Sequence, residues 1–549
     1  MKDLDHIAPE PGLRPPETVM RLSRMGAMFP SRLSFLRALT RRLHHEGARL
    51  TRPVWEIDAQ GYGHAVYTIA VGGRPYSLVA VSSHLPDDLR SDRVIATAWD
   101  TAYVLFDGVP GAADIARLVA EAPKQEAARF SERDLVLSRA NRSVRLFSHV
   151  VERLRAGQQP DPALIDSVGY LMRTTAVYGN GKFGIADRAL YADRPGLSGP
   201  FAAEMLTVWM IRTFTHELVE HLGGAPLDRD IKRHLGIGNA TGLGMAPFLV
   251  SHPVLLHNWM TARETALARV RRLPALDDAA RGTLHALAER AQRHLDSWTL
   301  PDPHHAAILA RLRQDWAELR VWMRDGFLQD APLDALIRRA ERYDAPTQEL
   351  AVSLAIEPFG RLVDDLCDGM NDNSGLAPLP FATPQEARRA IERHFDWALA
   401  LRFDDPDETR QFWYVSEEKL EPRLGDRHSE DGAERESPLD IARRVQELYH
   451  ALDESCDLRA FRAASPEHEL ALTRLACVMR HPYSEIRDNL IGAGCLPIDM
   501  LRSKLSFFGA TKFDPKSDRW TRVTLAQGAP LPDELHSPRA DDWWMAVRA

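Results

Sequence analysis

Residues 64–82 read HAVYTIAV, then GGRP, then YSLVAVS, and this stretch decides the fold of the N-terminal region. Two runs rich in Val, Tyr, Ile and Thr flank a turn, where Gly72 and Gly73 supply positive φ angles. Strands joined by so short a turn pair antiparallel, whereas parallel strands need long crossover connections. The stretch therefore predicts a small antiparallel sheet and argues against a parallel Rossmann sheet at this position.

Other segments of the chain show strand or helix periodicity. A second strand pair is predicted at 93–98 and 102–107, and strand character returns at 506–509 and 520–525, which predicts a terminal hairpin. An N-terminal helix is expected around residues 32–43. Apolar residues at helical spacing predict further helices at 130–156, 161–177, 201–223, 255–272, 277–298, 304–327, 333–342, 386–403, 439–452 and 467–479.

These patterns predict an α+β, helix-dominated protein with three consecutive parts. Residues 1–110 form an N-terminal helix and a small antiparallel β-sheet, and residues 111–375 form a central all-helical domain. Residues 376–549 form a mixed C-terminal part with the terminal hairpin and a densely charged loop at 422–438.

Composition limits the partners and the compartment. The 549 residues carry 69 Lys and Arg against 77 Asp and Glu, a formal charge of −8 that argues against nucleic-acid binding. The four cysteines lie far apart, which is typical of a reducing cytoplasm. The most apolar stretch, 243–260, contains prolines and histidines, so no membrane span and no membrane partner are expected.

The first candidate site is a loop at 173–184 with three closely spaced glycines. Arg173, Asn180 and Lys182 are predicted to bind an anionic group, and Tyr178 to act as an acid or base. Phe183 stands where a phosphate-binding Walker loop needs Ser or Thr, so that motif is rejected. A glycine-rich helix C-cap is the structural alternative.

The second candidate site lies on the apolar helix predicted at 201–223. Arg212 and His216, four residues apart on one side, are predicted to bind substrate, and Glu217 to orient a histidine. His216 and His221 are five residues apart, about 140° around a helix, so the zinc-protease motif is rejected. The structural alternative pairs Arg212 with Glu204 or Glu217 in an ion-pair network.

The third candidate site follows four glycines in residues 236–248. The preceding segment 228–235 is predicted to be helical, which does not fit a dinucleotide-binding loop. Asn239 is predicted to contact substrate, and His252 and His257 to serve as general bases. Packed core histidines are the alternative.

Together the three segments predict an enzyme that acts on an anionic small organic molecule by acid–base chemistry in a helical pocket. A first alternative is a metal-dependent oxidoreductase with non-haem iron or manganese, its ligands being His216, Glu217, His221, His252 and His257. A second alternative is a non-catalytic helical interaction protein. The acidic turn at 364–372 fails the EF-hand spacing, no cofactor fingerprint is present, and a homo-oligomer is compatible with the sequence.

Overall fold

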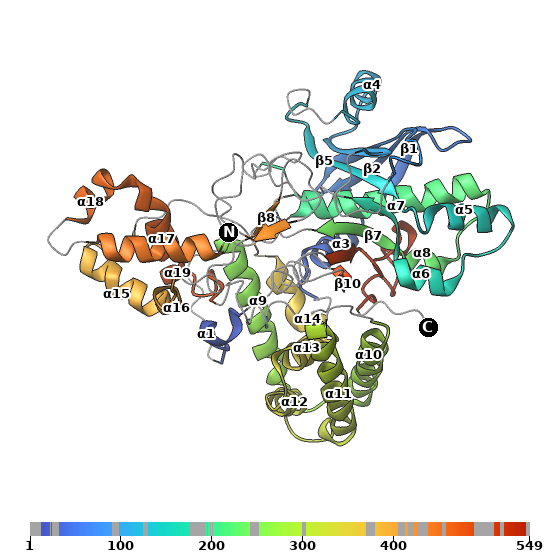
Figure 1. Ribbon diagram of the computed structural model, residues 1–549. Coiled ribbons are helices and arrows are strands. Elements are labelled where there is room, and N and C mark those ends of the chain that lie inside the picture. The colour runs from blue at the N-terminus through green and yellow to red at the C-terminus, as the bar shows by residue number, and fades with distance from the viewer. Residues whose placement is uncertain are drawn as a thin grey trace. The chain divides into compact units, whose positions relative to one another are not determined.

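The computed structural model is a helix-dominated α+β protein, as the sequence predicts. Its strands gather mainly in one large sheet, and the helices account for more of the chain (Figure 1). The structure describes residues 12–21, 24, 32–90, 98–124, 130–174, 193–194, 196–197, 199, 201–241, 252–298, 303–368, 370, 379–403, 412–414, 422–424, 438–452, 457–487, 510–515 and 521–544.

The chain divides into two compact units, each assembled from separate stretches of sequence. Unit 1 comprises Met1–Ala27, Gly242–Ala275 and Phe327–Lys504. Unit 2 comprises Met28–Thr241, Leu276–Gly326 and Leu505–Ala549. The three consecutive domains expected at 1–110, 111–375 and 376–549 stay a prediction.

Unit 2 contains a nine-stranded sheet with the strand order β1-β2-β3-β4-β5-β6-β7-β11-β10. All neighbours pair antiparallel except β6 and β7, which are parallel. The strands are β1 (Thr51–Ile57), β2 (Gly63–Val71), β3 (Arg74–Ser82), β4 (Thr101–Asp107), β5 (Asp134–Arg142), β6 (Tyr170–Thr174), β7 (Gly236–Thr241), β10 (Ala510–Pro515) and β11 (Thr521–Leu525).

The hairpin predicted at residues 64–82 is confirmed. Val71 pairs with Arg74 at the end of β2 and β3, so the loop contains two residues. Gly72 and Gly73 have φ angles of 62° and 76°. Positive φ at both central positions is typical of a type I′ turn, whose twist matches that of the flanking strands.

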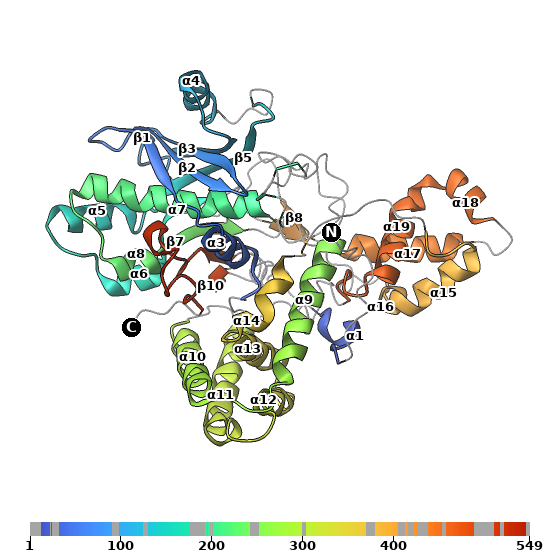
Figure 2. The same ribbon diagram turned by 180° about the vertical axis from the view of Figure 1, so that it is seen from behind.

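Helices cover both faces of the β2–β5 region. Helix α4 (Ala112–Glu121) contributes Leu118 to an apolar cluster with Val66, Val79 and Val104, which are paired across β2, β3 and β4. On the other face Phe214 of α7 (Ala202–Gly223) packs against Tyr67 and Tyr103. In Figure 1 and Figure 2 the strands accordingly lie between α4 and α7. Coverage on both faces explains why every residue of β4 is buried.

Two segments predicted as helices contain strands, and these predictions are wrong. Residues 130–156 form β5 and then the short helix α5 (Phe147–Arg155). Residues 161–177 form α6 (Pro162–Val168) and then β6, with Gly169 in the left-handed conformation between them. The sheet therefore extends into the region that was expected to be entirely helical, because pairing with distant strands overrides the local helical pattern.

A terminal hairpin is present as predicted, formed by β10 and β11, and β11 lies close to its expected position. The strand expected at 506–509 lies outside the described residues. β11 also pairs with β7, which follows the predicted helix at 228–235, observed as α8 (Arg229–His234). A Cβ atom on Gly238 of β7 would lie 2.6 Å from the ring of Tyr170 on β6. Glycine is required there because the neighbouring strand packs so closely.

Three further helices belong to unit 2. Helix α3 (Phe35–His45) confirms the N-terminal helix and packs on α7. Helices α10 (Asp278–Asp296) and α11 (Pro303–Gly326) pack against each other and confirm the helices predicted at 277–298 and 304–327. A short 3₁₀ turn, η7 (Pro532–Glu534), lies in the C-terminal segment.

Unit 1 is mainly helical. Helices α9, α12, α13 and α14 pack together, and so do α15, α16, α17 and α19. Its elements are α1 (Pro16–Val19), α9 (Pro253–Arg271), α12 (Pro332–Ala340), α13 (Ala345–Ile356), α14 (Gly360–Val363), η4 (Asp364–Cys367), α15 (Pro384–His394), α16 (Asp396–Leu399), β8 (Phe412–Tyr414), β9 (Pro422–Leu424), α17 (Pro438–Ala451), α18 (Leu458–Ala464), η6 (Pro466–His468) and α19 (Glu469–Arg480). Among the described residues, no helix has the length and apolar character needed to cross a membrane.

Candidate functional site

A half-open pocket of about 380 Å³ lies within unit 1. One wall comes from the N-terminal segment, with Arg14, Pro15, Thr18 and Arg24. The rest of the lining comes from α12, α13 and the turn between them, with Ile337, Ala340, Glu341, Gln348 and Val352. We call residues 12–21 the N-terminal strap. The pocket therefore combines an apolar surface with both signs of charge.

Arg14 of the strap is clamped between two buried carboxylates. Its Nε and Nη2 donate to the two carboxylate oxygens of Glu264 on α9, each at 2.8 Å. Its Nη1 donates to Glu349 on α13 at 2.9 Å. The side chains of Glu264 and Glu349 are only 1% and 0% exposed, so this guanidinium neutralises carboxylates that water does not reach.

Arg14, Glu264 and Glu349, which we call the clamp, influence the charge states of their neighbours. Burial by itself would raise the pKa of Glu264, but the guanidinium of Arg14 outweighs it and holds the pKa below its usual value. Arg263, the residue before Glu264, also forms an ion pair with Glu349. Burial, and then the charge of Arg14, lower the pKa of Arg263 to about 10. Removal of Arg14 would therefore leave Glu264 without its main partner.

Arg24 contacts other residues of the described chain through one of its three guanidinium nitrogens. Its Nη1 donates to the side chain of Gln348 at 2.6 Å and to Glu349 at 3.1 Å. Within the described part of the chain, its Nε and Nη2 have no hydrogen-bond partner. Burial, and then the nearby charge of Arg14, lower the pKa of Arg24. Nε and Nη2 form the edge of a guanidinium that binds carboxylates with two parallel hydrogen bonds.

His257 also lies in unit 1, on α9. Its Nδ1 accepts the main-chain N–H of Tyr483 at 3.2 Å, and the two rings stack with centroids 5.8 Å apart. Burial, and then the neighbouring His481, lower the pKa of His257 to about 3. Because Nδ1 accepts a hydrogen bond, the neutral ring carries its proton on Nε2, and no free lone pair is left. The contacts therefore favour a structural role, while the general-base role of His257 stays a prediction, as does that of His252 just before α9.

The predicted substrate-binding residue Arg212 lies in unit 2, on α7, and is 2% exposed. All its hydrogen bonds go to main-chain carbonyl oxygens, those of Lys232, Arg233, Leu235, Ala529 and Pro530. Burial, and then the charge of Arg233, lower its pKa to about 9. The ion pair expected with Glu204 or Glu217 is wrong, because carbonyls fill every donor of this guanidinium. Its substrate-binding role stays a prediction without a free donor to support it.

The other polar residues of α7 have separate partners. His216 is buried beside Arg212, and burial, followed by the charges of Arg212 and Lys232, holds its pKa well below the usual value. Glu217 accepts a hydrogen bond from the hydroxyl of Tyr67 at 2.8 Å and forms an ion pair with Arg52. His221 Nε2 donates to the carbonyl of Asp58 at 2.8 Å. The structure thus brings Arg212 and His216 together and directs Glu217 to the sheet.

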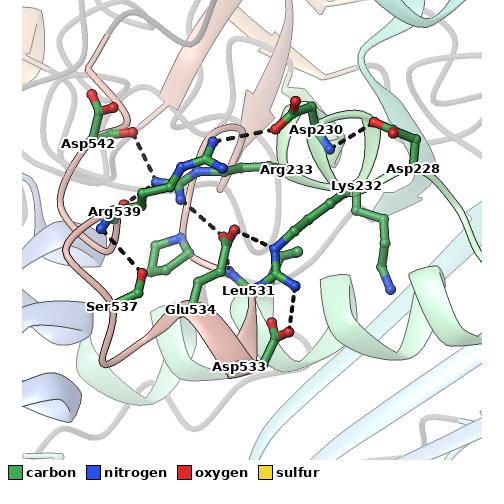
Figure 3. Close-up of polar contacts among 12 residues, drawn as sticks. Asp228, Asp230, Lys232, Arg233, Leu531, Asp533, Glu534, Ser537, Arg539 and Asp542 are labelled. Atoms are coloured by element: carbon green, nitrogen blue, oxygen red, sulfur yellow. Dashed lines mark hydrogen bonds and ion pairs between the residues drawn. The ribbon is translucent and has the colours of Figure 1, made fainter.

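The carbonyls around Arg212 belong to a wider network that fixes the C-terminal segment, shown in Figure 3. Arg233 donates to the carbonyl of Gly528 at 3.1 Å, to the carboxylate of Glu534 at 3.0 Å and to the carbonyl of Asp542 at 2.9 Å. Arg539 adds a contact to Asp230 at 3.4 Å. Since these arginines bind the chain's own groups, the network serves packing.

The loop of the first candidate site lies partly outside the described residues. Its predicted site residues Tyr178, Asn180 and Lys182 are not among the described residues. Arg173 is buried on β6, and its strand position pairs with Gly238 of β7. Asn239 is the next residue of β7 and pairs with Thr174. The structure therefore brings Arg173 and Asn239 onto neighbouring strands, and their binding roles stay predictions.

Metal ligands were predicted in one alternative. Among the described residues, no group of three or more His, Cys, Asp and Glu side chains is arranged to hold a metal ion. In the proposed set, His216, Glu217 and His221 belong to unit 2 and have the partners given above, while His252 and His257 belong to unit 1. The described residues therefore give no geometric support to the hypothesis of a metal-dependent oxidoreductase.

Sequence reasoning missed the residues that form the pocket and its clamp. A usable signal was present, because Glu264 and Glu349 interrupt apolar helical runs and a buried charge must find a partner. Their partner Arg14 could not be found in this way, since it lies 250 and 335 residues away along the chain.

Comparison with protein families, curated proteins and solved structures finds no match to this chain.

Proposed function

We propose that this protein binds an anionic small organic molecule in the unit 1 pocket, and that Arg24 holds the anionic group. The observation that carries the proposal is that Arg24 lines the pocket and keeps Nε and Nη2 without a partner among the described residues. A guanidinium edge of this kind pairs with the two oxygens of a carboxylate or phosphate. The apolar lining would accept the rest of the ligand.

The size and charge of the pocket narrow the ligand class. A volume of about 380 Å³ is near the lower end of the roughly 300–1,000 Å³ that small-molecule sites occupy. Ile337, Ala340 and Val352 offer a surface for a short hydrocarbon body. Exposed Glu341 also lines the pocket and would attract a positively charged group. These features favour a small carboxylic acid or amino acid.

Acid–base catalysis on this ligand is a further part of the proposal, with His252 and His257 of unit 1 as the sequence-based candidates. A cytoplasmic setting also belongs to it. The sequence observation behind it is that the four cysteines lie far apart.

The binding step is testable by thermal denaturation with a panel of small carboxylic acids and amino acids at millimolar concentration. We expect at least one of them to raise the unfolding midpoint of the wild type. Arg24→Lys keeps the charge but lacks the paired donors, so its shift should be much smaller.

Arg21→Lys is the matched control, because Arg21 is in the same N-terminal region, does not line the pocket and donates to the carbonyls of Glu17 and Arg487. It should respond to the ligand as the wild type does. An Arg24→Lys variant with an undiminished ligand response would exclude Arg24 as the anion contact.

A further inference from the structure

The strap forms a wall of the pocket, yet few buried side chains hold it in unit 1. Of its residues, Val19 and Met20 are buried, while Glu17 is largely exposed. Main-chain contacts add the hydrogen bond from Arg487 N–H to Met20 carbonyl at 2.8 Å. Helix α1 has only four residues and cannot stabilise itself. Glu17 forms an ion pair with Arg487 at 2.9 Å, and Arg21 donates to the carbonyl of Arg487 at 3.5 Å. Among residues 12–21, Arg14 is the one that pairs with fully buried carboxylates.

The contacts of Arg14 resemble those of a ligand in a binding site. The guanidinium enters from a segment distant in sequence and meets carboxylates on two longer helices, α9 and α13. It pairs edge to edge with Glu264 and reaches Glu349 with its remaining nitrogen. The hydroxyl of Tyr483 also donates to the carbonyl of Arg14 at 2.9 Å, which fixes the main chain at the entry point.

We infer that Glu264 and Glu349 form a guanidinium-binding site that the chain fills with its own Arg14. The strap is then a latch, and its docking creates the wall on which Arg14, Pro15 and Thr18 face the pocket. Release of Arg14 removes that wall and opens the pocket. By thermodynamic reciprocity, a compound that binds the closed pocket holds the strap in place.

The latch is distinct from an ordinary surface ion pair because its two halves differ in solvent access. Arg14 is 15% exposed and can regain water when the strap leaves, whereas both carboxylates stay between helices. An unpaired buried carboxylate is unfavourable, so the vacated site retains affinity for a guanidinium cation. The site should therefore accept a free guanidinium compound when Arg14 is removed.

Chemical rescue tests this inference on the full chain. Arg14→Ala should lower the thermal unfolding midpoint, and millimolar methylguanidinium should restore a large part of the loss. Methylammonium has the same charge without paired donors and should restore little. The wild type, whose site is filled, should gain nothing.

The double variant Arg14→Ala with Glu264→Gln provides the control for the site itself. It should show no rescue. The inference is overturned if methylguanidinium fails to stabilise a folded Arg14→Ala variant, or if the wild type or the double variant gains equally. The proposed anion binding does not enter this measurement, so either proposal can fail without the other.

Hydrogen exchange provides a second test if Arg14→Ala does not fold. Arg14→Lys keeps a cation in the site but loses the edge-to-edge contact, so amides of residues 12–21 should exchange about tenfold faster or more. Arg269→Lys is the matched control, because Arg269 lies on α9 outside the strap and pairs with exposed Asp365, and it should leave strap exchange unchanged. If the amides of residues 12–21 exchange in Arg14→Lys at the wild-type rate, Arg14 does not hold the strap.

Discussion

The guanidinium of Arg212 donates from Nε to the carbonyl oxygen of Leu235 at 2.7 Å, deep inside unit 2. Leu235 directly follows α8. The other nitrogens of Arg212 donate to the carbonyls of Lys232 and Arg233 on α8 and of Ala529 and Pro530. One side chain thus fixes three parts of the unit: the helix that carries it, the end of α8 and the C-terminal segment.

We predict that Arg212→Lys lowers the free energy of unfolding by at least about 2 kcal/mol, since lysine cannot donate in all these directions and buried carbonyls lose their partners. Urea denaturation measures the change. Arg52→Lys is the control, because Arg52 is 42% exposed and its ion pair with Glu217 should contribute at most about 1 kcal/mol. Equal effects of the two substitutions would contradict a special role for Arg212.

His216 should make stability depend on pH. Its pKa in the folded state is far below the usual value of 6.5, so below pH 6.5 the unfolded chain binds a proton that the folded chain does not. Stability therefore falls as the pH is lowered from about 6.5, by up to about 1.4 kcal/mol per pH unit for this group.

His216→Asn should reduce that slope, measured as unfolding free energy between about pH 6.5 and 5. The exposed His45 offers a control, because His45→Asn should retain the wild-type slope. An unchanged slope in His216→Asn would mean that this imidazole takes up its proton as readily in the folded state as in the unfolded state.

Two glycine substitutions should have opposite effects. Gly238→Ala places a methyl group 2.6 Å from the Tyr170 ring, which we expect to cost about 1–3 kcal/mol or more through overpacking. Gly282 lies within α10 with nothing near an added Cβ, so Gly282→Ala should stabilise by about 0.5–1 kcal/mol. Thermal or urea denaturation gives both values, and a neutral Gly238→Ala would argue against the close β6–β7 contact.

The sequence predicts the elements whose cause is local. The β2–β3 hairpin was predictable because its two-glycine turn and its alternating strands adjoin in sequence, and α7 because its apolar run is long. β5 and β6 were missed because each adjoins a short helix. The apolar residues keep a helix-like spacing across the strand and its neighbouring helix, so each pair was predicted as one long helix. The parallel pairing of β6 with β7 joins segments separated by α7 and α8, and no local pattern reports it.

The candidate site was predictable only in part. Buried charges on α7 were recognised, but their partners are carbonyls, which no side-chain pattern can reveal. The pocket in unit 1 depends on Arg14 meeting two helices far along the chain. Spacing along one helix predicts which side chains share a face and says nothing about such distant partners.

The contact between Arg212 and Ala529, which are 317 positions apart, has a consequence for biosynthesis. While the ribosome makes the intervening stretch, Arg212 on α7 can already reach the carbonyls of Lys232, Arg233 and Leu235, but the two partners of its Nη1 do not yet exist. The Nη1 group must remain hydrated until Ala529 and Pro530 emerge, so unit 2 can complete its interior only after those residues have been made. The nascent protein is therefore expected to need protection from aggregation until then.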